Sequence, residues 1–176
     1  MTPLQTLTED NVRLLEQGLA LLEELDVSLY DKAQPSVYLS SAGSHFRHLL
    51  EFYDRFLEGL KVGKVDYDLR QRESAIETDP VAAQERLVAV IEDLRRLDRE
   101  PAGLLVKSDS DGGAAAEPPW TRSTASRELQ ALLSHTLHHY ALIAIGLRLN
   151  GVDPGEEFGV APSTLRYWKE QRACAR

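Results

Sequence analysis

The chain has 176 residues, of which 43% are hydrophobic and 27% are charged, and its net charge is −8 at pH 7. These proportions are ordinary for a globular protein in water, and no apolar run reaches the roughly 18 uncharged residues that would indicate a membrane span. The net negative charge also lacks the basic excess with which proteins usually bind nucleic-acid phosphates. We therefore expect a single domain over residues 1–176 that contacts neither a membrane nor nucleic acid.

The ends of the chain indicate a cytoplasmic location. The N-terminus starts Met1-Thr2-Pro3-Leu4 and does not show the basic segment followed by an apolar one that is typical of a secretory signal. Cys174 is the only cysteine, so no intramolecular disulfide can form, which suits a reducing compartment. We therefore predict a cytoplasmic protein.

Apolar residues at helical spacing predict two amphipathic helices in the first third of the chain. The first covers about residues 8–29, with Thr8 as its N-cap. The second starts at Ser41 or Ser44, both of which are good capping residues, and runs to Leu60. Each helix has one apolar face and one charged face, as expected for helices that pack around a common core.

A third helix is predicted from Asp79-Pro80 to about Leu97. An acidic cap followed by proline at the first helical position is a strong start signal, because the missing N–H of proline has no helical partner there in any case. The segments on either side are less regular. The sequence predicts an irregular crossing over 65–78, a short strand over 104–107 and a turn over 108–113.

The fourth predicted helix is the longest and runs from Ser123 or Thr124 to Asn150, where Asn150-Gly151 gives a typical helix end. A short last helix starts at Pro162, and we expect it to pack against the others. Its apolar residues are Leu165, Tyr167 and Trp168. The fold class predicted from these elements is all-α, a four-helix bundle with a short extra C-terminal helix.

The five histidines fall into two clusters, one in each of two predicted helices. They are His45 and His48 in the second helix and His135, His138 and His139 in the fourth. His135 and His139 are four residues apart, so their side chains project from one face of the helix, one turn apart. On a helical wheel His45 lies well inside the apolar face, and His48 and His138 lie nearer its edge.

Two interpretations of these histidines are open. Any single histidine on an apolar face is most simply a core residue with a hydrogen-bonded neighbour. Several buried imidazoles in one core, however, need something to take up their lone pairs, and a divalent metal does so. Three protein ligands would leave coordination positions open for a substrate or for water. The position after His135 is Thr136, not the glutamate of a zinc protease, and no Gly-x-Ser-x-Gly nucleophile motif occurs.

Two segments carry a resemblance to a known family. They are Ser41-Ala42-Gly43-Ser44-His45-Phe46-Arg47-His48-Leu49-Leu50 and Ser134-His135-Thr136-Leu137-His138-His139-Tyr140. In sequence, spacing and order they resemble the DinB-like (YfiT-like) superfamily of metal-dependent proteins, and the similarity extends from the second predicted helix to Gly151.

The resemblance implies a four-helix bundle, often a homodimer, that binds one divalent ion, commonly nickel or zinc. The ligands of relatives are a histidine of the second helix and a His-x-x-x-His pair of a later helix. The pair carries over onto His135 and His139, and the remaining ligand onto His48, with His45 as the alternative. The arginine that often follows the last histidine in relatives is Tyr140 here.

The resemblance also implies candidate functions. Some relatives are transferases that attach a low-molecular-weight thiol such as bacillithiol or mycothiol to an electrophile, and an open metal site would favour the thiolate that such a reaction needs. A metal-activated hydrolase is the second hypothesis. The third is a non-enzymatic dimeric stress or binding protein with a structural metal.

Overall fold

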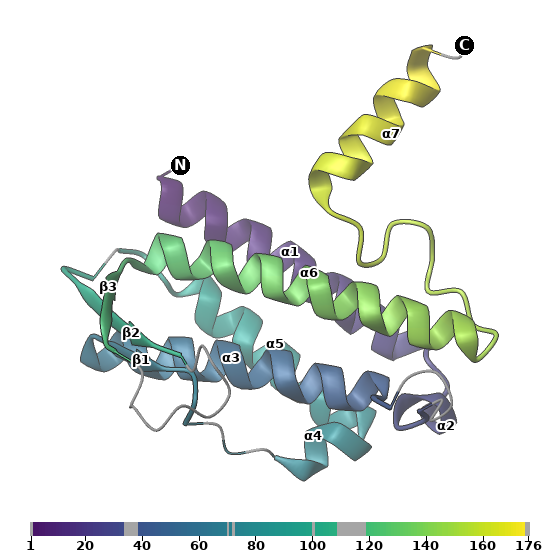
Figure 1. Ribbon diagram of the computed structural model, residues 1–176, viewed down its shortest axis with the longest axis horizontal. Helices are drawn as coiled ribbons and strands as arrows, with labels where there is room; N and C mark the ends of the chain where they lie inside the picture. The colour runs from purple at the N-terminus through teal and green to yellow at the C-terminus, as the bar shows by residue number, and fades with distance from the viewer. Residues whose placement is uncertain are drawn as a thin grey trace.

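The computed structural model describes residues 2–33, 39–69, 71, 73–99, 101–108 and 119–174, and it is predominantly helical (Figure 1). Its helices are α1 (Pro3–Glu24), α2 (Val27–Tyr30), α3 (Ala42–Val62), α4 (Ser74–Thr78), α5 (Pro80–Arg95), α6 (Ala125–Leu149) and α7 (Pro162–Cys174). Its strands are β1 (Lys64–Asp66), β2 (Leu104–Lys107) and β3 (Thr121–Ser123). Within these residues no helix is both long and apolar enough to cross a bilayer.

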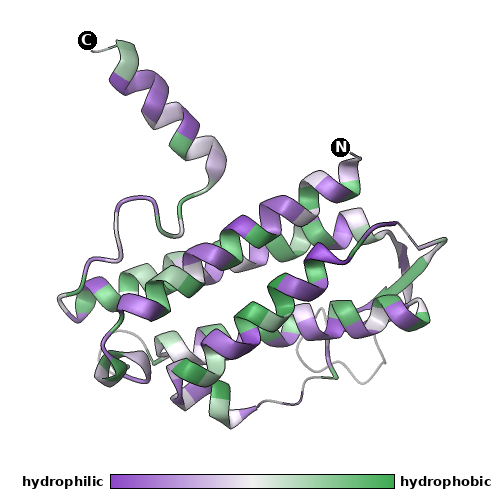
Figure 2. Ribbon diagram, turned by 180° about the vertical axis from the view of Figure 1, so that it is seen from behind, coloured by the Kyte–Doolittle hydropathy of each residue, from purple (hydrophilic) through white to green (hydrophobic). Residues whose placement is uncertain are grey.

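The four long helices surround the core. Helix α1 packs against α5 and α6, and α3 packs against the same two helices, so each helix has two neighbours (Figure 1). Hydrophobic and hydrophilic residues interleave along each of these helices (Figure 2), as expected when one face is buried and the other is wet. Completely buried side chains come from all four: Leu15, Phe46, Leu49, Phe56, Leu87, Val90, Leu129 and Tyr140.

The predicted starts of three long helices are confirmed by their caps. The side chains of Ser41, Asp79 and Thr124 each accept a hydrogen bond from a backbone N–H in the first turn of α3, α5 and α6. Helix α3 ends at Gly63, whose φ of 73° is a backbone conformation that glycine adopts without steric cost. Each of these signals acts within one turn of the helix, so it can be recognised from the sequence alone.

The prediction for the first helix was wrong at both ends. Helix α1 begins at Pro3 because Thr2 and Gln5 form a reciprocal capping box, and Thr8 is buried in the second turn. The helix ends at Glu24, and Asp26 caps the separate short helix α2 by accepting a hydrogen bond from the Ser28 N–H. The apolar spacing runs through this break, so periodicity alone did not show it.

A small three-stranded sheet corrects the all-α expectation. The strand order is β1-β2-β3, with β1 parallel and β3 antiparallel to β2. Strand β2 matches the predicted strand over 104–107, but β1 and the helix α4 lie in the stretch expected to be irregular. Strands of three residues have too little periodicity to be seen without their partners. Of the predicted turn over 108–113, residues 109–113 lie outside the described part of the chain.

Helix α7 does not pack as expected. It projects away from the long helices (Figure 1), and none of its described residues is buried. Tyr167 is 58% exposed and Trp168 37% exposed. The prediction that these side chains contribute to the core was therefore wrong.

Candidate metal centre

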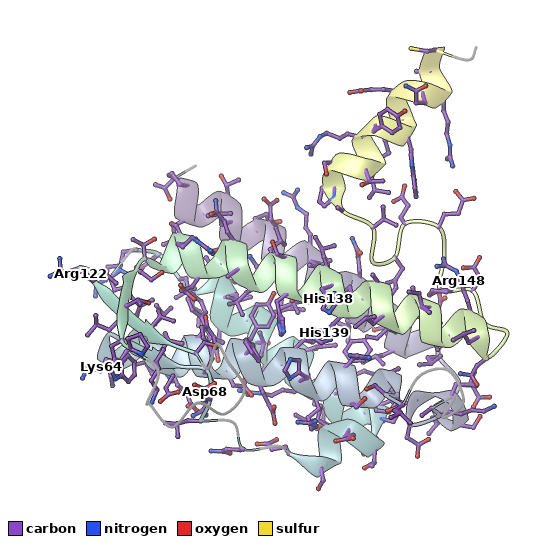
Figure 3. All side chains as sticks on the ribbon, viewed as in Figure 1. Lys64, Asp68, Arg122, His138, His139 and Arg148 are labelled. Carbon is purple, nitrogen blue, oxygen red and sulfur yellow. The ribbon has the colours of Figure 1, made fainter. Side chains whose placement is uncertain are left out.

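Helices α3 and α6 pack side by side and bring three imidazoles together. His48 comes from α3, and His135 and His139 come from successive turns of α6. The Nε2 atom of His135 lies 3.2 Å from Nε2 of His48 and 3.1 Å from Nε2 of His139. Figure 3 shows His139 on the side of α6 that faces α3.

The spacing of these nitrogens fits the ligand shell of a small divalent ion. Tetrahedral zinc with Zn–N bonds of about 2.0–2.1 Å places neighbouring ligand nitrogens about 3.3 Å apart. One ligand atom from each of the three histidines lies within 4.8 Å of the other two. The ring planes cross at 61°, 68° and 79°, so the imidazoles converge through their edges instead of stacking face to face. The three side chains could therefore hold one ion and leave further positions open.

His45 and His138 lie outside this group of three. His45 is 6% exposed, and its Nδ1 lies 2.8 Å from Nδ1 of His139, whose other ring nitrogen, Nε2, contacts His135. His45 therefore contacts His139 from outside the group of three. It is more deeply buried than His48, as the helical wheel predicted. His138 is exposed, as its position at the margin of the apolar face predicted.

Burial favours the neutral form of His45 and His139. Burial is the largest cause that lowers the pKa of His139 from 6.5 to about 2, and the neighbouring imidazoles, His135 first, contribute in the same direction. Burial, and to a lesser extent the neighbouring His138, lowers the pKa of His45 to about 4. A protonated imidazole has no lone pair to offer, so a low pKa preserves metal-binding capacity down to acidic pH.

A buried hydrogen-bond network supports α6 next to His135. The Tyr53 hydroxyl donates to Oδ1 of Asn11 over 2.7 Å, and the Asn11 amide donates to the Leu129 carbonyl over 3.0 Å. Because the Tyr53 proton is used in this way, the hydroxyl of Thr136 donates to Tyr53 over 3.1 Å. The network joins α1, α3 and α6 one residue from a candidate ligand. Sequence reasoning missed Asn11, although an asparagine beside Val12 on the apolar face was a detectable signal.

An aromatic pair borders the imidazoles on one side. The ring of Phe52 lies 4.2 Å from that of His135 and stacks on Tyr67 at 5.0 Å between ring centroids. The Tyr67 hydroxyl donates to the buried carboxylate of Glu128 over 2.9 Å, which fixes the ring. Phe52 is only half-buried, so the candidate centre has an apolar wall that a ligand could contact.

Tyr140, which directly follows His139, belongs to the core. Its ring is completely buried and stacks on Phe158 at 4.7 Å. Its hydroxyl lies against Gly18 of α1, where an added Cβ would come within 2.0 Å of the oxygen. Tyr140 therefore sets how closely α1 and α6 approach each other.

Comparison with known proteins gives one partial similarity. The chain is 34% identical over 111 residues to FK506-binding protein 5 of Rhizopus delemar. The match covers 61% of this chain and 28% of that protein, so the chain spans less than a third of its relative's length. No protein-family model and no solved structure matches the chain.

Proposed function

We propose that the protein is a DinB-like four-helix bundle that binds one divalent transition metal, zinc or nickel, through His48, His135 and His139. The observation that carries this proposal is the 3.1–3.2 Å spacing of the three Nε2 atoms. The mutual packing of α1, α3, α5 and α6 supports the bundle. The position of the histidines on α3 and α6 agrees with the motifs that resemble this superfamily.

The reaction we propose is the transfer of a low-molecular-weight thiol to a small electrophile. An ion held by three imidazoles keeps coordination positions open, at which a thiol sulfur could bind. The Lewis acidity of the ion would then favour the thiolate over the thiol. Burial keeps His139 neutral and ready to bind. Phe52 gives an apolar surface beside the centre, against which the carbon skeleton of an electrophile can lie. We also propose, from the sequence, that the protein is cytoplasmic and works as a homodimer.

A conjugation assay tests the reaction. Purified protein loaded with zinc or nickel is mixed with bacillithiol or mycothiol and a fluorogenic electrophile, and the rate is compared with that of the metal-free protein. We expect conjugation to need the metal and to be lost in His135→Ala, and to persist in His138→Ala, which removes an exposed histidine outside the group of three. Activity that survives His135→Ala would refute the proposal. Ester or amide turnover without thiol would point instead to a metal-activated hydrolase.

A further inference from the structure

The contact between His45 and His139 has a consequence for metal binding. We infer that His45 is a positioning residue for the metal centre: its Nδ1 accepts a hydrogen bond from Nδ1–H of His139 and thereby directs the Nε2 lone pair of His139 toward the ion. This inference rests on the proposed metal binding at His48, His135 and His139. It assigns His45 a role that is neither ligand nor mere core packing.

The proton count at the two rings leads to this assignment. The two Nδ1 atoms are 2.8 Å apart, so one of them must carry the proton and the other must accept it. A neutral imidazole has one N–H and one lone pair. If His45 were the donor, His139 would have to carry its own proton on Nε2, the atom that faces His135. If His139 is the donor, its Nε2 lone pair is free to bind metal. Metal binding and the His45 hydrogen bond therefore select the same tautomer.

The first turn of α3 fixes where His45 lies. It lies one turn before His48 on α3, and its backbone N–H donates to the backbone carbonyl of the helix cap Ser41 over 3.3 Å. The cap is itself fixed by a reciprocal pair of hydrogen bonds with Ser44. The backbone of His45 is thus anchored at the first turn of the helix, which places the ring against His139 with 5.0 Å between ring centroids.

The space beside His45 is small. The cavity that its ring borders has a volume of about 10 Å³, and its walls include Leu142 and Ile143. A cavity needs about 10–15 Å³ to hold even one water molecule. A substrate therefore does not fit there. The contact that links His45 to the group of three is the one with His139.

Substitutions at His45 separate the accepting role from packing. His45→Leu fills the space with an apolar side chain of similar size but removes the acceptor. Loss of a hydrogen-bond partner of a metal ligand typically lowers metal affinity by about 10- to 100-fold. His45→Asn keeps an acceptor, because its Oδ1 is the same number of bonds from the backbone as Nδ1 of histidine. We expect zinc affinity to fall by about 10- to 100-fold in His45→Leu and to recover most of that loss in His45→Asn.

The experiment measures zinc affinity of the full chain, without a histidine tag, by competition with a chelator of known affinity. His138→Leu is the matched control, because His138 is exposed and adjacent, and we expect wild-type affinity. Circular dichroism of each metal-free variant checks that the fold is retained. If His45→Leu does not fold, the comparison of His45→Asn with wild type and the tautomer measurement below decide the question.

Long-range ¹H–¹⁵N correlation spectra of the zinc-loaded wild type report the tautomer directly. We expect the proton of His139 on Nδ1 and the nitrogen signal of a metal-bound Nε2. Wild-type zinc affinity in a folded His45→Leu, or a proton on Nδ1 of His45, would overturn the inference and leave the metal centre intact. A wild-type protein that binds no zinc or nickel would instead overturn the proposed function.

Discussion

At the scale of single residues, the chemistry of the candidate centre depends on which ring nitrogen of each histidine faces its neighbours. The sequence identified the pair His135 and His139 because their spacing is a property of one helix. The choice of His48, with His45 as the alternative, came from the family resemblance, since spacing alone does not tell how far α3 is shifted along α6. The helical wheel correctly gave the depth of His45, but depth does not tell which partner a ring meets. The structure groups His48 with the pair and places His45 behind it.

The lowered pKa values predict that the metal-free protein is less stable in acid. His45 and His139 take up protons near pH 6.5 when unfolded but only near pH 4 and pH 2 when folded. Below pH 6.5 the unfolded state therefore binds more protons, and stability falls as the pH falls. Each of the two residues is expected to contribute a loss of about 2 kcal/mol between about pH 7 and about pH 5.

Urea unfolding of the metal-free protein at the two pH values measures this loss. His45→Asn lacks one of the buried titrating groups, so its loss between the two values is expected to be smaller by about 2 kcal/mol. An equal loss in wild type and variant would show that His45 is protonated as readily in the folded chain as in the unfolded one.

At the scale of elements, close contacts between helices set the geometry around the histidines. The starts of α3, α5 and α6 were predictable because each cap acts within one turn. The strands β1 and β3 were not, because each exists only through its pairing with β2, which is far away in the sequence. The buried network of Asn11, Tyr53 and Thr136 was missed for the same reason, since its members come from three helices.

Removing the Tyr53 hydroxyl tests this network. In Tyr53→Phe the buried Asn11 side chain loses its donor and the Thr136 hydroxyl loses its acceptor. We expect the free energy of unfolding to fall by about 1–3 kcal/mol. Chemical denaturation of wild type, Tyr53→Phe, Asn11→Ala and the double variant measures the coupling. Strictly additive losses would contradict a shared network.

The contact between Gly18 and Tyr140 gives a second prediction at this scale. A Cβ at Gly18 would lie 2.0 Å from the Tyr140 hydroxyl oxygen and 2.8 Å from the ring carbon that bears it. Gly18→Ala is therefore expected to destabilise the protein by about 1–3 kcal/mol through overpacking. Tyr140→Phe removes the nearer atom, so Gly18→Ala should cost less in that background. A Gly18→Ala variant as stable as wild type in thermal unfolding would show that α1 and α6 are not held this close.

At the scale of the whole molecule, the long helices differ from α7 in burial. The long helices share a continuous core, whereas none of the described residues of α7 is buried. The sequence predicted α7 as a helix but not its placement, because two or three apolar residues do not specify a packing partner. The homodimer that we expect from the resemblance stays a prediction, to be measured by light scattering of the full chain.

Deletion of residues 162–176 tests the independence of the core from α7. Since no described residue of α7 is buried, we expect the truncated protein to unfold cooperatively within a few degrees of the wild-type Tm and to bind the same amount of metal. Differential scanning calorimetry and elemental analysis measure the two quantities. A large loss of Tm or of metal would mean that α7 contributes to the folded core or to the centre.

The most direct test of the metal centre is elemental analysis of the protein purified without a histidine tag. Wild type, His48→Ala and His135→Ala are compared, with His138→Ala as the control and circular dichroism as the check on folding. We predict about one equivalent of zinc or nickel per chain in wild type and in His138→Ala, and loss of that metal in the other two variants with the fold retained. A folded wild-type protein that carries no transition metal, and takes up none when zinc or nickel is added, would contradict the account and leave the imidazoles as core residues.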